Sequence, residues 1–242
     1  MKKTTNQKGN VLFLILIAVA LFAALSYAVT QSSRSGGDAS RETNILNAAQ
    51  LTQYPTSIRT AVLRLVIDGY QDTNILYTNP ASIVTNSASE PYQVFATIGG
   101  GAIYQNAPGD MMQSGGINET GQWYINMDFE IPELGRTAVA NLAGNELTAF
   151  LPGITESVCT RINLEANILT NPTTPNPQLA SSVLGGAAGD VDRNLNVLTD
   201  YGSSSVTLDS AANDFTRQPF GCFEDVTANP RNFVLYTVVL ER

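Results

Sequence analysis

The chain has 242 residues, with 21 acidic and 13 basic side chains, a net charge of −8 and no histidine. An acidic chain repels phosphate backbones, so we expect no nucleic-acid partner. The lack of histidine excludes the Ser-His-Asp and Cys-His catalytic arrangements and most zinc sites.

The most apolar part of the sequence is a 19-residue run from Val11 to Val29, which contains no charged residue. At 1.5 Å per residue, a helix of this length crosses roughly 30 Å of hydrocarbon. Lys2, Lys3 and Lys8 precede the run, and positive charge on one flank keeps that flank in the cytoplasm. The run therefore predicts a membrane-spanning helix, with the remainder of the chain exported.

Three interpretations of this leading segment are open. A cleaved secretory signal would use the small residues around Ser26-Tyr27-Ala28, whereas a plain signal anchor needs only the apolar run and the charge bias. The third interpretation rests on Lys8, Gly9 and Asn10, a basic residue and a glycine directly before the apolar run. This arrangement resembles the processing site of type IV prepilins and type II secretion pseudopilins. The resemblance implies that a prepilin peptidase cuts after Gly9 and leaves Asn10 as the new N-terminus.

Two residues depart from the pattern of that family. Asn10 stands where the family usually has an aromatic residue or Met, and Leu14 stands at the fifth processed position, where the family usually has Glu. In pilin assemblies that Glu meets the amino terminus of a neighbouring subunit, which Leu14 cannot do. The loss fits a K-type minor pseudopilin at a filament tip, which also lacks the Glu. It fits equally well a protein that never enters a filament.

After a polar stretch, apolar residues return at helical spacing and predict a second helical part that stops at Asp68-Gly69. The apolar positions are Ile45, Ala49, Ile58, Val62, Leu65 and Val66. Pro55 interrupts the pattern, which predicts a kink or a restart near Tyr54. Gly36-Gly37 would loosen the helix where it leaves the membrane. A long N-terminal helix of this kind is also how pilin-like proteins are built.

From Tyr70 onward the sequence changes to turns and short strands. Alternation over Trp123–Ile131 predicts a strand with its large apolar residues on one face. These residues are Trp123, Ile125, Met127, Phe129 and Ile131. Tyr92–Ile98 and Ala102–Tyr104 are β-rich and flank Gly99-Gly100-Gly101, which predicts a hairpin.

Further strands are predicted at Leu147–Leu151, ended by Pro152-Gly153, and at Asn232–Leu240, whose apolar density suits a central strand. Residues 170–190 are rich in Pro, Gly, Asn and Ser and predict an exposed excursion. We therefore expect an α+β fold in which a long N-terminal helix packs on a head with an antiparallel sheet.

The two cysteines, Cys159 and Cys222, are predicted to form one disulfide, because an exported domain folds on the oxidising side of the membrane. The alternative is two free buried thiols. Thr155 would cap a helix over Glu156–Asn167 that carries Cys159. Closing a loop of roughly 60 residues contributes on the order of 4 kcal/mol. Pilin heads also often carry a disulfide near the C-terminus.

One loop resembles the start of a calcium-binding loop because oxygen side chains occur at alternate positions. The candidate residues are Asp190, Asp192, Asn194 and Asp200. Leu195 stands where an EF-hand needs glycine, and Tyr201 replaces the Glu at the twelfth position. We expect a solvated turn here, with calcium binding as the alternative, and no other cofactor.

Other candidate chemistry is explained without catalysis. Asp128 and Glu130 share one face of a predicted strand, which suits a glycosidase pair, but a solvent-facing strand edge also explains them. Glu224 and Asp225 form a second adjacent pair. The glycine run lacks the lysine of a phosphate loop, and Trp123 fits a core position better than a sugar platform. We therefore expect no enzyme.

The sequence predicts four regions: a cytoplasmic leader at 1–9, a transmembrane helix at 10–30, a helical stalk at 31–69 and an extracytoplasmic head at 70–242. The functional hypothesis is a pilin-like structural or assembly subunit, anchored in a bacterial inner membrane by a single pass. Its expected partners are the membrane, other pilin-like or secretion-machinery subunits and a prepilin peptidase. The alternative is a bitopic envelope protein whose acidic head binds a ligand or partner. A secreted hydrolase that uses carboxylates is a third hypothesis.

Overall fold

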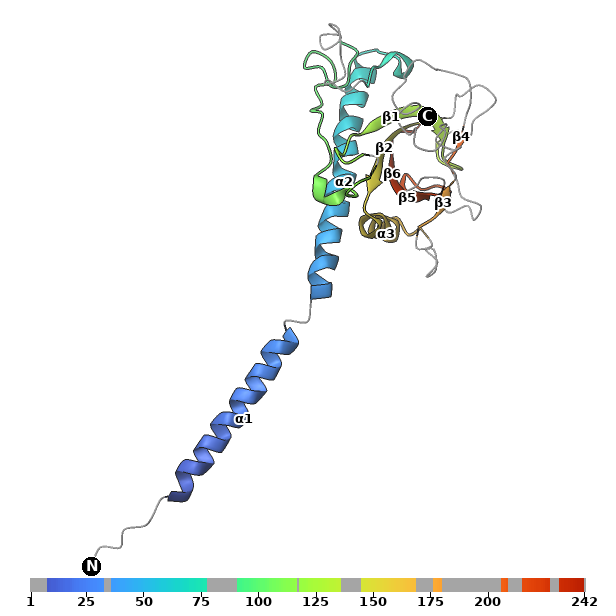
Figure 1. The fold of residues 1–242 in the computed structure, drawn as a ribbon. Coiled ribbons are helices and arrows are strands. Elements are labelled where there is room, and N and C mark those ends of the chain that lie inside the picture. Colours follow the sequence, from blue (N-terminus) through green and yellow to red (C-terminus); the bar gives the residue numbers. More distant parts are fainter. Residues whose placement is uncertain are drawn as a thin grey trace, which may run out of the picture. The chain divides into compact units, whose positions relative to one another are not determined.

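The computed structural model describes residues 8–32, 36–77, 91–116, 118–135, 145–168, 176–179, 206–208, 215–226 and 231–241. Within these residues the chain is α+β, with three α-helices and a mixed sheet of six strands (Figure 1). The chain divides into two compact units, Met1–Thr43 and Asn44–Arg242. Each unit is described by itself below.

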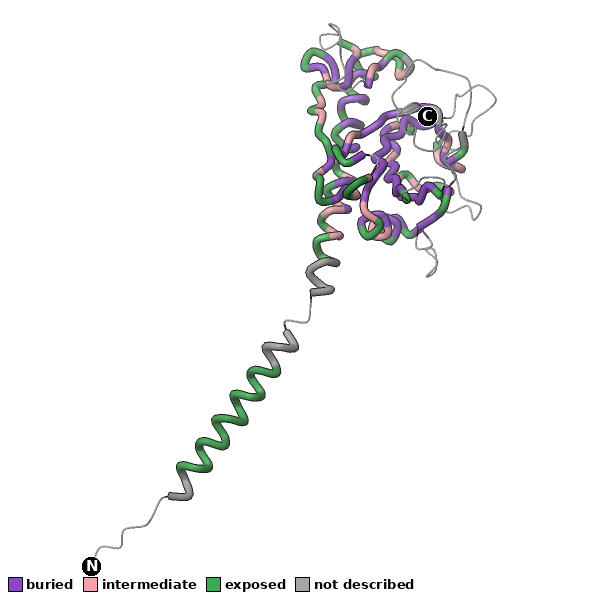
Figure 2. The backbone as a smooth tube through the Cα atoms, viewed as in Figure 1, coloured by how far each residue is buried: buried purple, intermediate pink, exposed green. Residues whose placement is uncertain are grey.

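Helix α1 (Lys8–Ser32) belongs to the first unit. Its side chains from Val11 to Tyr27 are all exposed (Figure 2). Over the described residues, no helix combines the length and the apolar content needed to cross a membrane.

Helix α2 (Gly36–Ile67) ends where Asp68-Gly69 predicts. Gly69 has a φ of 96°, and the Tyr70 amide donates to the Leu65 carbonyl at 3.1 Å, so the last turn closes through a left-handed residue. Of the kink or restart predicted near Tyr54, the restart is wrong, because the helix continues through Pro55. Buried side chains on both sides of Pro55 pack into the core of the second unit and hold the helix together across the missing backbone hydrogen bond.

The buried face of α2 differs in part from the predicted face. Its fully or nearly fully buried residues are Ala48, Leu51, Ile58, Ala61, Val62 and Leu65. Ile58, Val62 and Leu65 were predicted correctly, whereas Val66 is 40% exposed. The spacing of the buried residues is that of a helix with one apolar stripe directed at a core.

The sheet has the strand order β3-β5-β6-β2-β1-β4. Its strands are β1 (Tyr124–Glu130), β2 (Glu146–Ile154), β3 (Gln178–Leu179), β4 (Val206–Thr207), β5 (Phe220–Asp225) and β6 (Asn232–Leu240). The four inner strands pair antiparallel, as predicted, but β3 pairs with β5 and β4 pairs with β1 in parallel. The sheet is therefore mixed. The prediction of a central strand at Asn232–Leu240 is confirmed, since β6 lies between β5 and β2.

Two apolar clusters pack against the sheet. The first combines residues of α2 and of helix α3 (Glu156–Glu165) with strand residues such as Leu151 and Leu235. The second combines Phe150 and Tyr236 with residues of the connecting segments, Phe215 among them. Because successive side chains of a strand point to opposite faces, the sheet separates the two cores.

Strand β1 does not keep one apolar face, contrary to prediction. Asn126 pairs with Thr148, but Phe129 pairs with Glu146, so β1 carries one extra residue between the two pairs, as at a β-bulge. Trp123, Ile125 and Met127 consequently join the first core, and Phe129 and Ile131 join the second. A one-residue shift is enough to move a side chain to the other face.

Three further predictions need correction. Strand β2 does not end at Pro152-Gly153 but runs to Ile154, with a register shift there and a φ of 84° at Gly153. Tyr92–Ile98 and Ala102–Tyr104 form turns and irregular chain around the glycine run, without the predicted hairpin strands. Within the predicted exposed excursion, Asn176 and Pro177 are buried and β3 pairs with β5. Short 3₁₀ helices lie at Asp72–Asn74 and Gly109–Met111.

Candidate functional site

The first candidate site is the surface of α1. Phe13, Leu14, Leu21 and Phe22 are between 59% and 73% exposed, although each is strongly apolar. A helix that is apolar around its whole circumference has no single face to direct at a core, so it is stable where its whole circumference is covered. The surface of α1 from Val11 to Leu25 is therefore exposed and apolar.

The predicted processing residues lie at the start of this helix. Lys8, Gly9 and Asn10 form the first turn of α1, and their side chains lie outside the described part of the structure. Leu14 lies one turn beyond Asn10 on the exposed apolar surface. Leu14, the fifth residue after Gly9, is therefore part of an exposed apolar surface.

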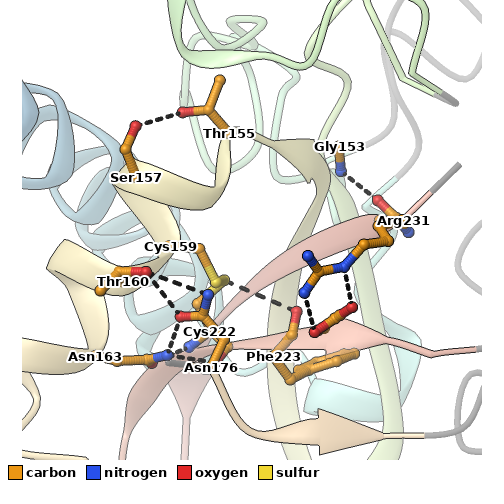
Figure 3. The surroundings of a disulfide bond; sticks show 12 residues. Gly153, Thr155, Ser157, Cys159, Thr160, Asn163, Asn176, Cys222, Phe223 and Arg231 are labelled. Atoms are coloured by element: carbon orange, nitrogen blue, oxygen red, sulfur yellow. Dashed lines mark hydrogen bonds and ion pairs between the residues drawn. A yellow bond between two sulfur atoms is a disulfide. The ribbon is translucent and has the colours of Figure 1, made fainter. Parts of the chain in front are cut away.

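The second candidate site is the link between α3 and β5. Cys159 and Cys222 form a disulfide with their Cα atoms 5.3 Å apart, and both residues are fully buried (Figure 3). The predicted pairing is confirmed, and the alternative of two free thiols is wrong. The bond fixes α3 to the strand that pairs with β6, so it joins the helix to the centre of the sheet.

An asparagine pair beside the disulfide was not predicted. The Cys222 amide donates to Asn163 Oδ1 at 2.8 Å, and Asn163 Nδ2 donates to the Cys222 carbonyl oxygen at 2.8 Å. Asn163 Nδ2 also donates to Asn176 Oδ1 at 3.0 Å, and Asn176 Nδ2 donates to Thr160 Oγ1 at 3.2 Å. One side-chain amide thus pairs with Cys222 as a neighbouring strand would.

A sequence signal for this pair does exist. Asn163 lies four residues after Cys159, one turn along the same helix, in an interior position where asparagine is unfavourable. A polar residue at such a position needs hydrogen-bond partners, and here the partner is the backbone of the second cysteine. The arrangement is structural, because both asparagines are buried and hydrogen-bonded within the chain.

Of the paired carboxylates, the structure places Glu224 in an ion pair and leaves the pair of Asp128 and Glu130 undetermined. The side chain of Asp128 lies outside the described part of the structure, so its pairing with Glu130 is not placed. Glu224 is 5% exposed and forms a two-pronged ion pair with Arg231, in which Arg231 Nη2 lies 2.7 Å from Glu224 Oε2. The Arg231 guanidinium lowers the pKa of Glu224 against the effect of burial. The ionised form of Glu224 is therefore favoured in the folded head.

Glu146 is a buried carboxyl group that forms no ion pair with a described arginine or lysine. It is fully buried at the start of β2, and its Oε2 accepts a hydrogen bond from the Ile131 amide at 2.8 Å. Within the described part of the chain its Oε1 has no hydrogen-bond partner. Burial raises the pKa of Glu146 to about 7. No sequence pattern singles out this residue.

Of the remaining predicted features, the calcium candidates Asp190, Asp192, Asn194 and Asp200 lie outside the described residues. In the part of the chain that is described, no three His, Cys, Asp or Glu side chains lie close enough together to hold a metal ion. Trp123 is 4% exposed, and its ring centroid lies 5.3 Å from that of Tyr54, so it is a core residue.

The glycine run packs against α2. A Cβ atom added to Gly100 would lie 2.5 Å from the Val94 carbonyl oxygen and 3.0 Å from the Ala61 Cβ. The glycines therefore allow close packing of a turn on a helix.

No family model, curated protein or solved structure matches this chain.

Proposed function

We propose that the protein is a pilin-like, membrane-anchored structural or assembly subunit of a pilus or secretion pseudopilus. Its N-terminus would lie in the cytoplasm of a bacterial cell, and its head would lie on the far side of the inner membrane. The run from Val11 to Val29 would cross the membrane or pack in a filament core, and the head would face partner proteins. The proposal includes no catalysis and no cofactor.

The observation that carries the proposal is the exposed apolar surface of α1. Eleven large aliphatic or aromatic side chains between Val11 and Leu25 are 40% exposed or more. Burying a Val, Leu, Ile or Phe side chain is worth about 1.5–3 kcal/mol, so covering this helix gains on the order of 20 kcal/mol. Lipid, neighbouring apolar helices and the core of a large protein cover a helix on all sides, and the lysines before the run favour the first two.

The head supports export. Disulfides persist on the oxidising side of a membrane and are rare in the cytosol. The bond between Cys159 and Cys222 is fully buried. The chain is rich in uncharged polar residues and has few charged ones. Both features suit a domain that folds after translocation.

Leu14 supports a minor or tip position in such an assembly. A subunit at the end of a filament has no neighbour on one side, so it has no need of the family's buried Glu. The same residue supports the alternative function, a bitopic envelope protein in which α1 acts only as a tether. In that case the acidic head would bind a ligand or partner directly.

The mature N-terminus separates these functions. Mass spectrometry of the chain from a host with a prepilin peptidase should find Asn10 as the first residue, and Gly9→Ala should abolish the cleavage. Gly37→Ala is the matched control, since it makes the same change away from the processing site, and it should leave cleavage unchanged.

The other outcomes contradict the proposal in different ways. An intact Met1 or a start at residue 2 would favour the tether, and a start at Val29 would favour a secreted protein. Unchanged processing in Gly9→Ala would remove the main support for a pilin-like subunit. Recovery of the chain in the soluble cytosolic fraction with both sulfurs reduced would exclude all the exported forms.

A further inference from the structure

Glu146 is the first residue of β2, and its carboxyl group lies beside the last residues of β1. Glu146 Oε2 accepts the Ile131 amide at 2.8 Å, and Ile131 is fully buried directly after β1. The hydrogen bond therefore ties the residue after β1 to the first residue of β2. The second oxygen, Oε1, is buried and has no hydrogen-bond partner among the described residues.

Two described carboxylates lie close to Glu146 across the sheet. Phe129 pairs with Glu146 and Leu147 pairs with Leu240, so the next residues along the chain, Glu130 and Glu241, are neighbours of Glu146 across the sheet.

The segment after β1 adds one more carboxylate. Glu133 forms an ion pair with Arg217 at the surface, where both side chains are more than half exposed. No described arginine or lysine forms an ion pair with Glu146.

The two protonation states of Glu146 therefore differ strongly in free energy. A neutral carboxyl group can stay buried with one hydrogen bond. A carboxylate accepts the Ile131 amide more strongly, but it loses its hydration, forms no ion pair with a described arginine or lysine and is repelled by Glu130 and Glu241, and these losses are the larger. The backbone next to Ile131 holds other parts of the head: the Leu208 amide donates to the Glu130 carbonyl and the Arg217 amide to the Pro132 carbonyl, each at 2.8 Å.

We propose that Glu146 is a pH-dependent latch of the head. In its protonated form it holds the Ile131 backbone and, through the neighbouring carbonyls, strand β4 and the turn at 215–217. When Glu146 is ionised, its side chain leaves the buried site and the end of β1 is held less firmly. The attachments of β4 and of the turn at 215–217 to this backbone then loosen as well. The latch is independent of the proposed assembly function.

The direction of the pH effect follows from burial. Burial is the main cause that raises the pKa of Glu146 from 4.5 to about 7, and the charges of Glu130 and Glu241 raise it further. The hydrogen bond from the Ile131 amide acts in the opposite direction and lowers this pKa. The folded head therefore holds this proton more tightly than the unfolded chain does. Its stabilising effect is complete below about pH 4.5 and is lost as the pH rises towards and through 7.

Amide hydrogen exchange in the full chain, held in detergent micelles, tests the latch. Protection factors of the Ile131 and Leu208 amides, corrected for the intrinsic exchange rate, should fall at least about tenfold between about pH 5.5 and pH 8.5. In Glu146→Gln the protection should be the same at both values, because the carboxamide still accepts the Ile131 amide and does not ionise. Glu133→Gln is the matched control and should keep the fall of the parent chain.

The proposal is overturned if protection in the parent chain does not change with pH. It is overturned equally if Glu146→Gln shows the same fall as the parent chain. Should Glu146→Gln fail to fold, titration of the Glu146 carboxyl carbon by NMR in the unmodified chain decides the question. A midpoint near 7 supports the latch, and a midpoint below about 5 overturns it.

Discussion

The disulfide gives the most direct quantitative test of the fold. Cys159 and Cys222 are 63 residues apart in sequence, and closing a loop of that length lowers the entropy of the unfolded chain by an amount worth about 4 kcal/mol at 25 °C. Both residues are fully buried, so alanine is the better replacement, because serine would bury two hydroxyl groups. We expect the double variant Cys159→Ala/Cys222→Ala to be less stable by about 4 kcal/mol.

Urea unfolding in detergent micelles measures this loss. Trp123 is the only tryptophan of the chain and is 4% exposed, so its fluorescence reports unfolding of the head. With a slope of about 2 kcal/mol per M, the midpoint should fall by about 2 M.

The control uses the parent chain and a reductant. Reductant added after unfolding should reproduce the fall in the midpoint. Reductant added to the folded chain should act slowly, because both sulfurs are shielded from solvent. A double variant within about 1 kcal/mol of the parent would refute the reasoning, since the loop closure would then not limit the unfolded chain.

Two further substitutions test the packing around the sheet. Asn163→Ala leaves the buried amide and carbonyl of Cys222 without their side-chain partner, so we expect a loss of about 2–3 kcal/mol in urea unfolding, and unchanged stability would contradict the strand-like role of Asn163. Gly100→Ala brings a Cβ to 2.5 Å from the Val94 carbonyl oxygen and should cost about 1–3 kcal/mol. Gly109→Ala, where nothing lies within 4 Å of the added Cβ, is its control, and equal losses in the two variants would exclude a clash as the cause.

Local patterns predicted those elements whose residues lie close together in the sequence. The end of α2 followed from a turn at Asp68-Gly69, and the central strand β6 followed from a dense apolar run. The disulfide followed from the number of cysteines and the expected compartment. In each case one strong local signal, or one simple count, determines the result without knowledge of the tertiary structure.

Pro152 and Pro55 show where local rules fail. Both residues are unfavourable inside regular elements, yet β2 and α2 continue through them. Each lies in a segment that is buried against the core on either side. The packing energy of the whole segment exceeds the loss of one backbone hydrogen bond, and that energy depends on residues distant in sequence.

The candidate site was predictable only in part for the same reason. The apolar run and the cysteines are visible as composition, but the partners of Asn163 and Glu146 are set by the tertiary fold. Asn163 pairs with Cys222, 59 residues away. In the sequence, Glu146 is one acidic residue before a predicted strand, and no local pattern shows that it is buried.

The bulge in β1 connects these observations. It places an extra residue between Asn126 and Phe129, which moves Phe129 into the second core and aligns it with Glu146. Strand β4 pairs in parallel with β1 at Phe129 and Glu130, directly after the bulge. Bulges re-aim side chains and end regular pairing, so this end of the sheet can accept both a parallel strand and a buried carboxyl group. Deleting one residue between Asn126 and Phe129 would leave a single residue opposite Leu147 and would make the ladder regular, while Phe129 would stay opposite Glu146 and the Glu146 side chain would keep its alignment with the Ile131 amide.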